Sequence, residues 1–200
     1  MGEAVRTSRK RGQILQAAGE VFLDQGYGGA SMDAIATAAG VSKATVYAHF
    51  AGKEQLFTEM VSAYCREQRA AVADIEAAHP AVEEGLRRIA LTIMRYLAHP
   101  RAMAFSRMIM GEATRFPDLG RAFVESGFLG LQREVAGVLE RAASRGELKL
   151  EDPALAAELF INMVRGPIQF RSLLARGEPP PEAELERIAA AAARLIAQAR

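Results

Sequence analysis

Four side chains that can donate hydrogen bonds to phosphate groups or base edges occur close together in this chain: Lys43, Thr45, Tyr47 and His49. No carboxylate lies between residues 41 and 53, and a helix that approaches a polyanion cannot easily carry one. These residue types and their spacing therefore predict contacts with DNA. An ordinary helical hairpin with a solvated outer face is the alternative.

The segment that must position these side chains, residues 31–50, reads SMDAIATAAGVSKATVYAHF. Gly40 can adopt the left-handed conformation that ends a first short helix, and Ser42 is a favourable N-cap for a second. Small and apolar residues occupy the positions where the two helices must cross, namely Ile35, Ala36, Ala39, Val41, Val46 and Phe50. The pattern predicts a helix-turn-helix whose second helix can enter a major groove.

Residues 9–68 resemble the N-terminal domain of the tetracycline-repressor (TetR) family of bacterial transcription regulators. The matching sequence is RGQILQAAGEVFLDQGYGGASMDAIATAAGVSKATVYAHFAGKEQLF, and VSKATVYAHF followed by KEQLF is its most specific part. The resemblance implies that Tyr47 and Lys53 contact phosphates and that residues 43–45 reach base edges. The candidate DNA-binding residues are Ser31, Ser42, Lys43, Ala44, Thr45, Tyr47, Ala48, His49 and Lys53.

Two later segments, GEATRFPDLGRAFVESG and RGELKLEDPALAAELFINMVRG, are similar to the ligand-sensing half of multidrug-efflux regulators. The TetR resemblance implies a homodimer in which the final two helices of each copy form a four-helix bundle. The expected interface residues are Leu159, Met163, Phe170, Leu185, Ile188, Ala192 and Leu195. The alternative is that these two helices only close the core of the monomer.

Helical periodicity covers nearly the whole chain and no convincing strand occurs, so the expected class is all-α. We predict a DNA-binding domain at 8–68 and a helical effector-binding and dimerisation domain at 80–200. Gly26–Gly29 should form a loop after a first helix. Gly166–Pro167 should kink or break a later helix that starts at Asp152–Pro153. The other expected helices cover residues 53–78, 81–98, 101–115, 118–145 and a final segment after Pro181.

Length, charge and cysteine content set outer limits. The chain has 200 residues, half of them hydrophobic, and a net charge of +1, which excludes a polycation that coats nucleic acid. Positive charge is instead concentrated near the N-terminus, at Arg6, Arg9, Lys10 and Arg11. The single cysteine, Cys65, excludes an intrachain disulfide and fits a reducing bacterial cytoplasm. No apolar run approaches a membrane span of ~18 residues, and no signal peptide is evident.

The middle of the chain is rich in Met and Phe, which suit a pocket for apolar molecules of varied shape. Core packing is the alternative for each of these residues. Asn162, Arg165 and Gln169 form one polar stripe that could orient a small hydrophobic effector. The candidate effector-binding residues are Met94, Met103, Phe105, Met108, Phe123, Asn162, Arg165 and Gln169.

Signals of catalysis are weak. The three histidines are scattered without a metal-ligand partner at i+3 or i+4, so we expect no metal, no cofactor and no enzyme. Three functions remain open: a ligand-responsive repressor, a helix-turn-helix regulator or activator without a small-molecule effector, and an all-helical enzyme or carrier.

Overall fold

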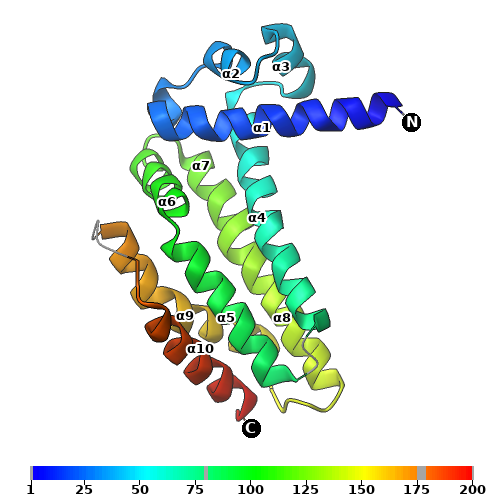
Figure 1. Cartoon of the computed structure of the whole chain (residues 1–200), viewed down its shortest axis with the longest axis vertical. Coiled ribbons are helices and arrows are strands. Elements are labelled where there is room, and N and C mark those ends of the chain that lie inside the picture. Colours follow the sequence, from blue (N-terminus) through cyan, green and yellow to red (C-terminus); the bar gives the residue numbers. More distant parts are fainter. Residues whose placement is uncertain (1, 79–80, 175–178, 200) are drawn as a thin grey trace. The chain divides into compact units, whose positions relative to one another are not determined.

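The computed structural model describes residues 2–78, 81–174 and 179–199, and in these ranges every regular element is a helix (Figure 1). The predicted all-α class is confirmed. Pro80, where the second domain is predicted to start, and the side chain of Arg6 lie outside the described residues. The elements are α1 (Gly2–Gly29), α2 (Met32–Ala38), α3 (Lys43–His49), α4 (Lys53–Ala78), α5 (Val82–Ala98), α6 (Pro100–Glu112), α7 (Pro117–Phe123), the π-helix η1 (Val124–Leu129), α8 (Gly130–Ser144), α9 (Pro153–Leu174) and α10 (Glu182–Ala197).

The chain divides into two compact units. Unit 1 comprises residues 1–64 and 107–127, and unit 2 comprises residues 65–106 and 128–200. Helix α4 therefore contributes its first half to unit 1 and its second half to unit 2. Residues 107–127, which the sequence places in the second domain, pack with the N-terminal elements.

An aromatic cluster forms the centre of unit 1. The rings of Phe22, Tyr27 and Phe57 lie 5.3–5.6 Å apart, and Phe116 meets Tyr27 edge-on at 4.9 Å. Edge-to-face rings at these distances attract each other beyond the burial of their surface. The apolar face of α1 is buried in this unit, at Ile14, Ala18, Val21 and Phe22. The cluster therefore joins α1, α4 and the α6–α7 turn into one body.

The predicted loop at Gly26–Gly29 is only partly right. Gly26 has φ 71° and ψ 165° and does break α1, in a conformation that side-chain-bearing residues rarely adopt. After this break the chain makes one more helical turn instead of a loop. The turn is stabilised because Tyr27 is buried in the aromatic cluster and the amide of Ala30 donates to Gly26 O at 3.1 Å.

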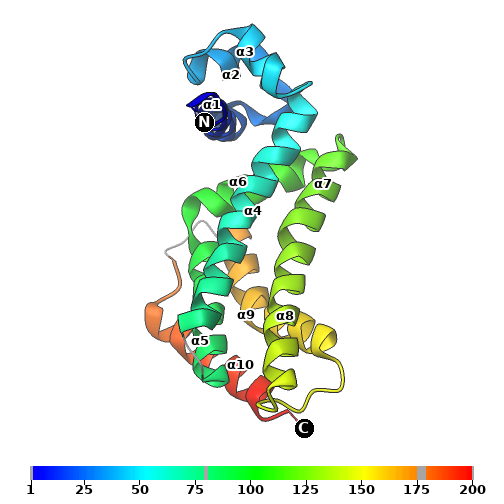
Figure 2. The ribbon, with the colours of Figure 1, turned by 90° about the vertical axis from the view of Figure 1, so that its right-hand side faces the viewer.

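Unit 2 is a helical bundle whose core lies between the apolar faces of α5, α8, α9 and α10 (Figure 2). Fully buried side chains such as Leu139, Phe160 and Ile168 fill its centre. At the surface, Arg87 of α5 pairs with both Glu84 and Glu186, and the second pair ties α5 to α10. Hydrogen bonds from Arg87 and Arg88 lower the pKa of Glu84 to about 2.

Two long helices of the body differ from their predicted course. Helix α9 runs without interruption from Pro153 to Leu174, so of the kink or break predicted at Gly166–Pro167 the break does not occur. A proline removes one amide donor, and burial of Val164 and Ile168 on either side holds the helix together. The single helix predicted for 118–145 is instead α7, η1 and α8, joined through a π-helical turn.

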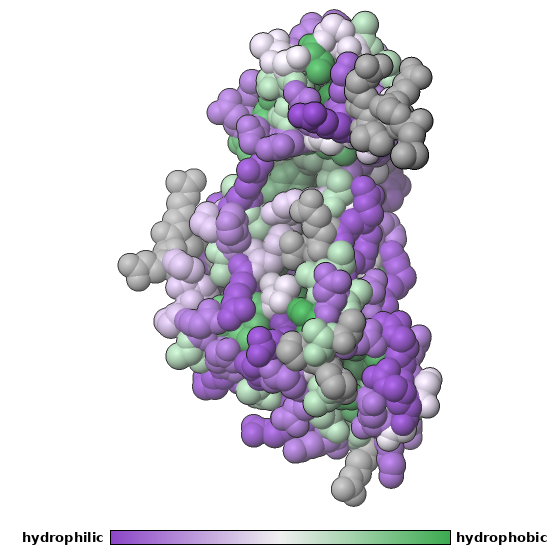
Figure 3. Space-filling view, turned by 45° about the vertical axis from the view of Figure 1, so that its right-hand side comes forward, coloured by the Kyte–Doolittle hydropathy of each residue, from purple (hydrophilic) through white to green (hydrophobic). Residues whose placement is uncertain are grey.

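None of the described helices is long and apolar enough to cross a bilayer. On the face drawn in Figure 3, hydrophilic side chains predominate and hydrophobic ones form small patches between them. Within the described residues, no group of His, Cys, Asp or Glu is arranged to hold a metal ion.

Candidate nucleic-acid interface

The helix-turn-helix forms from local signals that the structure shows directly. The hydroxyl of Ser31 accepts from the amide of Ala34 and caps α2, and the hydroxyl of Ser42 accepts from the amide of Thr45 and caps α3, each at 3.1 Å. Gly40 has φ 62°, the left-handed conformation predicted for the turn. These three residues set the angle at which α3 leaves α2. The predicted element is therefore confirmed with its caps.

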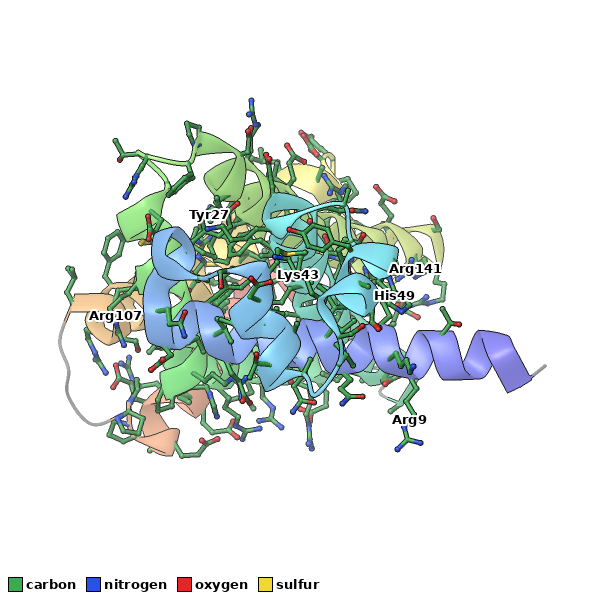
Figure 4. The ribbon with its side chains drawn as sticks, turned by 90° about the horizontal axis from the view of Figure 1, so that it is seen from above. Arg9, Tyr27, Lys43, His49, Arg107 and Arg141 are labelled. Atoms are coloured by element: carbon green, nitrogen blue, oxygen red, sulfur yellow. The ribbon has the colours of Figure 1, made fainter. Side chains whose placement is uncertain are left out.

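The outer face of α3 is open to solvent. Lys43, Ala44, Tyr47 and Ala48 are exposed, whereas Thr45 and His49 are partly covered. Viewed from above, Lys43 and His49 lie in front of α1, which crosses behind α2 and α3 (Figure 4). The inner face is closed by Val46 and Phe50, both buried as predicted. The exposed set can reach a groove without any change in the packing of α2 and α3.

Lys43 is paired in the free protein with Asp33 of α2, a partner that the sequence pattern did not reveal. Its Nζ atom lies 2.8 Å from Asp33 Oδ1 and 3.0 Å from Oδ2. The hydrogen bond from Lys43 raises the pKa of this ammonium group, and the Asp33 charge adds to the effect. Both side chains are exposed, so the pair can open at little cost. Asp33 therefore competes with any approaching phosphate for the ammonium group of Lys43.

We expect the substitution Asp33→Asn to raise DNA affinity about threefold at low salt, because it frees Lys43 and removes a charge that repels phosphate. Fluorescence anisotropy with labelled duplex DNA measures the change. Asp24→Asn, which removes an exposed carboxylate from α1, is the matched control. An equal effect of the two substitutions would show that the Lys43–Asp33 pair does not compete with DNA.

Lys53 holds the turn between α1 and α2. Its Nζ atom donates to Tyr27 O at 2.7 Å and to Ala30 O at 2.9 Å, with Gly28 O at 3.4 Å. It also lies 4.6 Å from the centre of the Tyr27 ring. Burial lowers the pKa of Lys53, and burial likewise raises the pKa of the Tyr27 hydroxyl. An ammonium group has three protons to donate, so a phosphate would have to displace one of these carbonyl groups.

The basic residues near the N-terminus lie on helix α1. Arg9 and Lys10 are exposed, and Arg9 is labelled on α1 in Figure 4. Arg11 is committed to unit 1, because its guanidinium lies 5.0 Å above the Phe50 ring and pairs with Glu59 of α4. Of the predicted basic group, Arg9 and Lys10 thus remain available to phosphates.

The candidate effector residues do not form one group. Met94 and Met103 are buried in the core of unit 2, as the core alternative foresaw, and Phe105 is also buried. Met108 and Phe123 belong to unit 1. A cavity of about 290 Å³ beside α5 and α10 is lined by none of the eight candidates.

The predicted polar stripe on α9 is only partly correct. The Nε atom of Arg165 donates to Gln169 Oε1, and Gln169 is buried. Asn162 is exposed, and the hydrogen bond that the described residues show on this stripe joins only Arg165 and Gln169. The structure therefore brings together two of the three residues.

The expected dimer residues fall into three groups by exposure. Leu159, Phe170 and Leu195 are 53%, 67% and 60% exposed, and Met163 and Ile188 are partly buried. Leu185 and Ala192 are buried in the core of unit 2, as the alternative that these helices close the monomer core expects. Sequence reasoning also missed Leu155 and Leu174 of α9, which are exposed as well. The α9 periodicity was a usable signal for both.

Two family models match the chain. The model for bacterial regulatory proteins of the tetR family matches residues 14–60, which include α2 and α3. The model for the C-terminal domain of AefR-like transcriptional repressors matches residues 84–199. The second match alone spans more than half of the chain.

Individual relatives agree with these matches. A TetR-family transcriptional regulator from Mesorhizobium loti has 33% sequence identity and a TM-score of 0.83, over 96% of both chains. The flavonoid-responsive regulator FrrA has 37% identity and a TM-score of 0.76, over 94% of this chain and 95% of its own. The HTH-type transcriptional activator FasR of Mycolicibacterium smegmatis is 50% identical over 56 residues, which make up 28% of this chain and 26% of FasR.

Proposed function

This chain belongs to the TetR family of bacterial regulatory proteins, and we propose that it is a dimeric repressor released from its operator by a small hydrophobic ligand. Family membership makes it a transcriptional regulator with a DNA-binding helix-turn-helix, and not an enzyme. The repressor role, the ligand and the dimer are the proposal. A regulator of this kind works where the chromosome is, in the bacterial cytoplasm.

The proposed DNA interface is the exposed face of α3 with its two caps. Lys43, Thr45 and the helix start are placed to reach base edges, and Tyr47 and His49 to reach the backbone. Ser31, Ser42, Ala44 and Ala48 allow the close approach of α2 and α3 to phosphates, and Lys53 supports them from behind. We keep residues 8–68 as the DNA-binding domain and 80–200 as the effector-binding and dimerisation domain.

A dimer is proposed because α9 leaves an unpartnered apolar stripe. Leu155, Leu159, Phe170 and Leu174 are all exposed along it, and Leu195 of α10 is exposed as well. A contiguous group of exposed large apolar side chains is typical of an interface between proteins. Helix-turn-helix proteins commonly read two half-sites about 34–36 Å apart, which needs two copies.

Control of DNA binding by a ligand is supported by the α6–α7 turn. Residues 107–127 fall in the predicted effector-binding domain, yet they pack in unit 1 with the helix-turn-helix. Glu112 Oε1 accepts from the amide of Gly28 at 3.1 Å, and Phe116 meets Tyr27. This is the observation that carries the proposal, because a shift of α6 or α7 must alter the turn from which α2 begins.

The names of two matches favour a ligand-released repressor over the other readings. The matched C-terminal model describes AefR-like repressors, and FrrA, the relative with 37% identity, is named as flavonoid-responsive. FasR is an activator, but the match covers only about a quarter of that protein. An activator, or a regulator governed by a protein partner, is therefore the second candidate.

We expect flavonoid aglycones or similar hydrophobic compounds to lower operator affinity several-fold in an anisotropy titration, on DNA selected from a random pool. Linkage requires operator DNA to weaken binding of the compound by the same factor. Phe116→Leu, which removes the ring contact with Tyr27, should keep DNA affinity but reduce the release. If no compound changes operator affinity, the regulator lacks a small-molecule effector of this class.

A further inference from the structure

A partly buried guanidinium on α9 has no acidic partner within the described ranges. The Nε atom of this side chain, Arg165, donates to Oε1 of the buried Gln169, and none of the described Asp or Glu side chains pairs with Arg165. Burial of an uncompensated charge is costly, because the protein interior solvates it poorly. Burial accordingly lowers the pKa of Arg165.

The side chain is nevertheless held in a defined position. The guanidinium carbon lies 4.3 Å from the centre of the Phe128 ring, a cation–π arrangement. Gln169, only 8% exposed, fixes the Nε edge. The terminal amino groups of Arg165, the pair that binds a carboxylate as a fork, have no acceptor in the described part of the chain.

Phe128 belongs to η1, the π-helical segment Val124–Leu129. Short π-helical segments occur frequently at functional sites. Phe128 also packs against the apolar core of unit 2. A fixed cation beside an apolar surface is the usual composition of a pocket for an amphipathic small molecule.

We propose that Arg165 binds the anionic oxygen group of an amphipathic effector, so that the ligand of this regulator is an organic acid with an apolar body. Gln169 and Phe128 act as positioning residues for the guanidinium. The proposal rests on the small-molecule response proposed above and names the chemical class of that molecule. It moves Asn162 out of the ligand site and keeps Arg165 and Gln169 in it.

Matched probes test the charge requirement on the full-length protein without DNA. Decanoate is compared with decanamide, and 1-naphthoate with 1-naphthamide, by isothermal titration calorimetry. The two pairs distinguish an aliphatic from an aromatic apolar body. We expect at least one acid to bind about tenfold or more tightly than its amide, as suits a charge-assisted fork.

Three variants separate recognition from folding. Arg165→Met should abolish the preference for the acid and leave amide binding unchanged, and Arg165→Lys should restore it only in part because the fork is lost. Arg171→Met, which removes an exposed guanidinium of α9 paired with Glu184, should keep the full preference. Arg165→Met should leave the melting temperature of the free protein unchanged or higher, since it removes an uncompensated charge.

The outcomes separate this inference from the proposed function. It is overturned if neither acid binds up to 1 mM (roughly the weak end of specific binding), if acid and amide bind equally, or if Arg165→Met keeps the preference. A loss of melting temperature in Arg165→Met with the preference intact shows a structural arginine. If an acid binds through Arg165 but operator affinity does not change, the inference stands and the ligand-released repressor fails.

Discussion

The double substitution Leu159→Glu with Phe170→Glu should convert the protein to a monomer and weaken operator binding about 100-fold or more. Both side chains are more than half exposed on α9, so the charges should not disturb the core of the protomer. Two copies across a dyad would face each other with four carboxylates where apolar surface had been buried. A monomer has only one helix-turn-helix. It therefore loses the gain in DNA affinity, about 10²–10⁴-fold, that comes from linking two of them.

Light scattering after size exclusion measures the first effect, since the protomer mass is 21.6 kDa. Anisotropy with the operator and with a single half-site measures the second. Met110→Glu is the matched control, because Met110 is an exposed apolar residue of α6 outside the stripe. A double variant that stays dimeric with an unchanged circular dichroism spectrum would place the interface elsewhere.

The sequence predicted well what depends on neighbours along the chain. Gly40 and the caps Ser31 and Ser42 act over three or four residues, so residue type alone indicates their role. The long helix α4 is observed at its predicted bounds, Lys53–Ala78. A lysine followed by an amphipathic run was enough to place it.

Contacts between elements could not be predicted in the same way. Asp33 lies ten residues before Lys43, and their pairing exists only because α2 and α3 cross at a given angle. The three carbonyl groups around Lys53 come from a turn more than 20 residues away. Side-chain type shows that a lysine can donate but not to which atom.

Periodicity also leaves the partner of an apolar face undecided. Leu185 and Leu195 of α10 were both expected at the interface, yet Leu185 is buried and Leu195 is 60% exposed. A hydrophobic stripe on a helix indicates which residues become buried, either on folding or on association. Whether they are covered by the same protomer or by a second copy depends on packing that only the folded structure reveals.

Lys53→Met should lower the free energy of unfolding by about 2 kcal/mol, because it removes a charged donor shared by carbonyl groups of residues 27 and 30. DNA affinity should fall with it, since the turn that positions α2 loosens. The salt dependence of DNA binding should stay unchanged if Lys53 acts only through this turn. Urea unfolding and anisotropy over a range of salt concentrations measure the two effects.

Two lysines serve as references for this result. Lys43→Met should show the opposite pattern, with stability unchanged and the salt slope reduced by about one unit, because Lys43 is exposed and lies on the face of α3 that we propose binds DNA. Lys149→Met, in unit 2, should change neither quantity. If Lys53→Met instead reduces the slope by one unit and leaves stability intact, its ammonium group leaves the carbonyls on binding and contacts a phosphate. Lys53 would then contact a phosphate, as the TetR resemblance implies, although it binds carbonyl groups in the free protein.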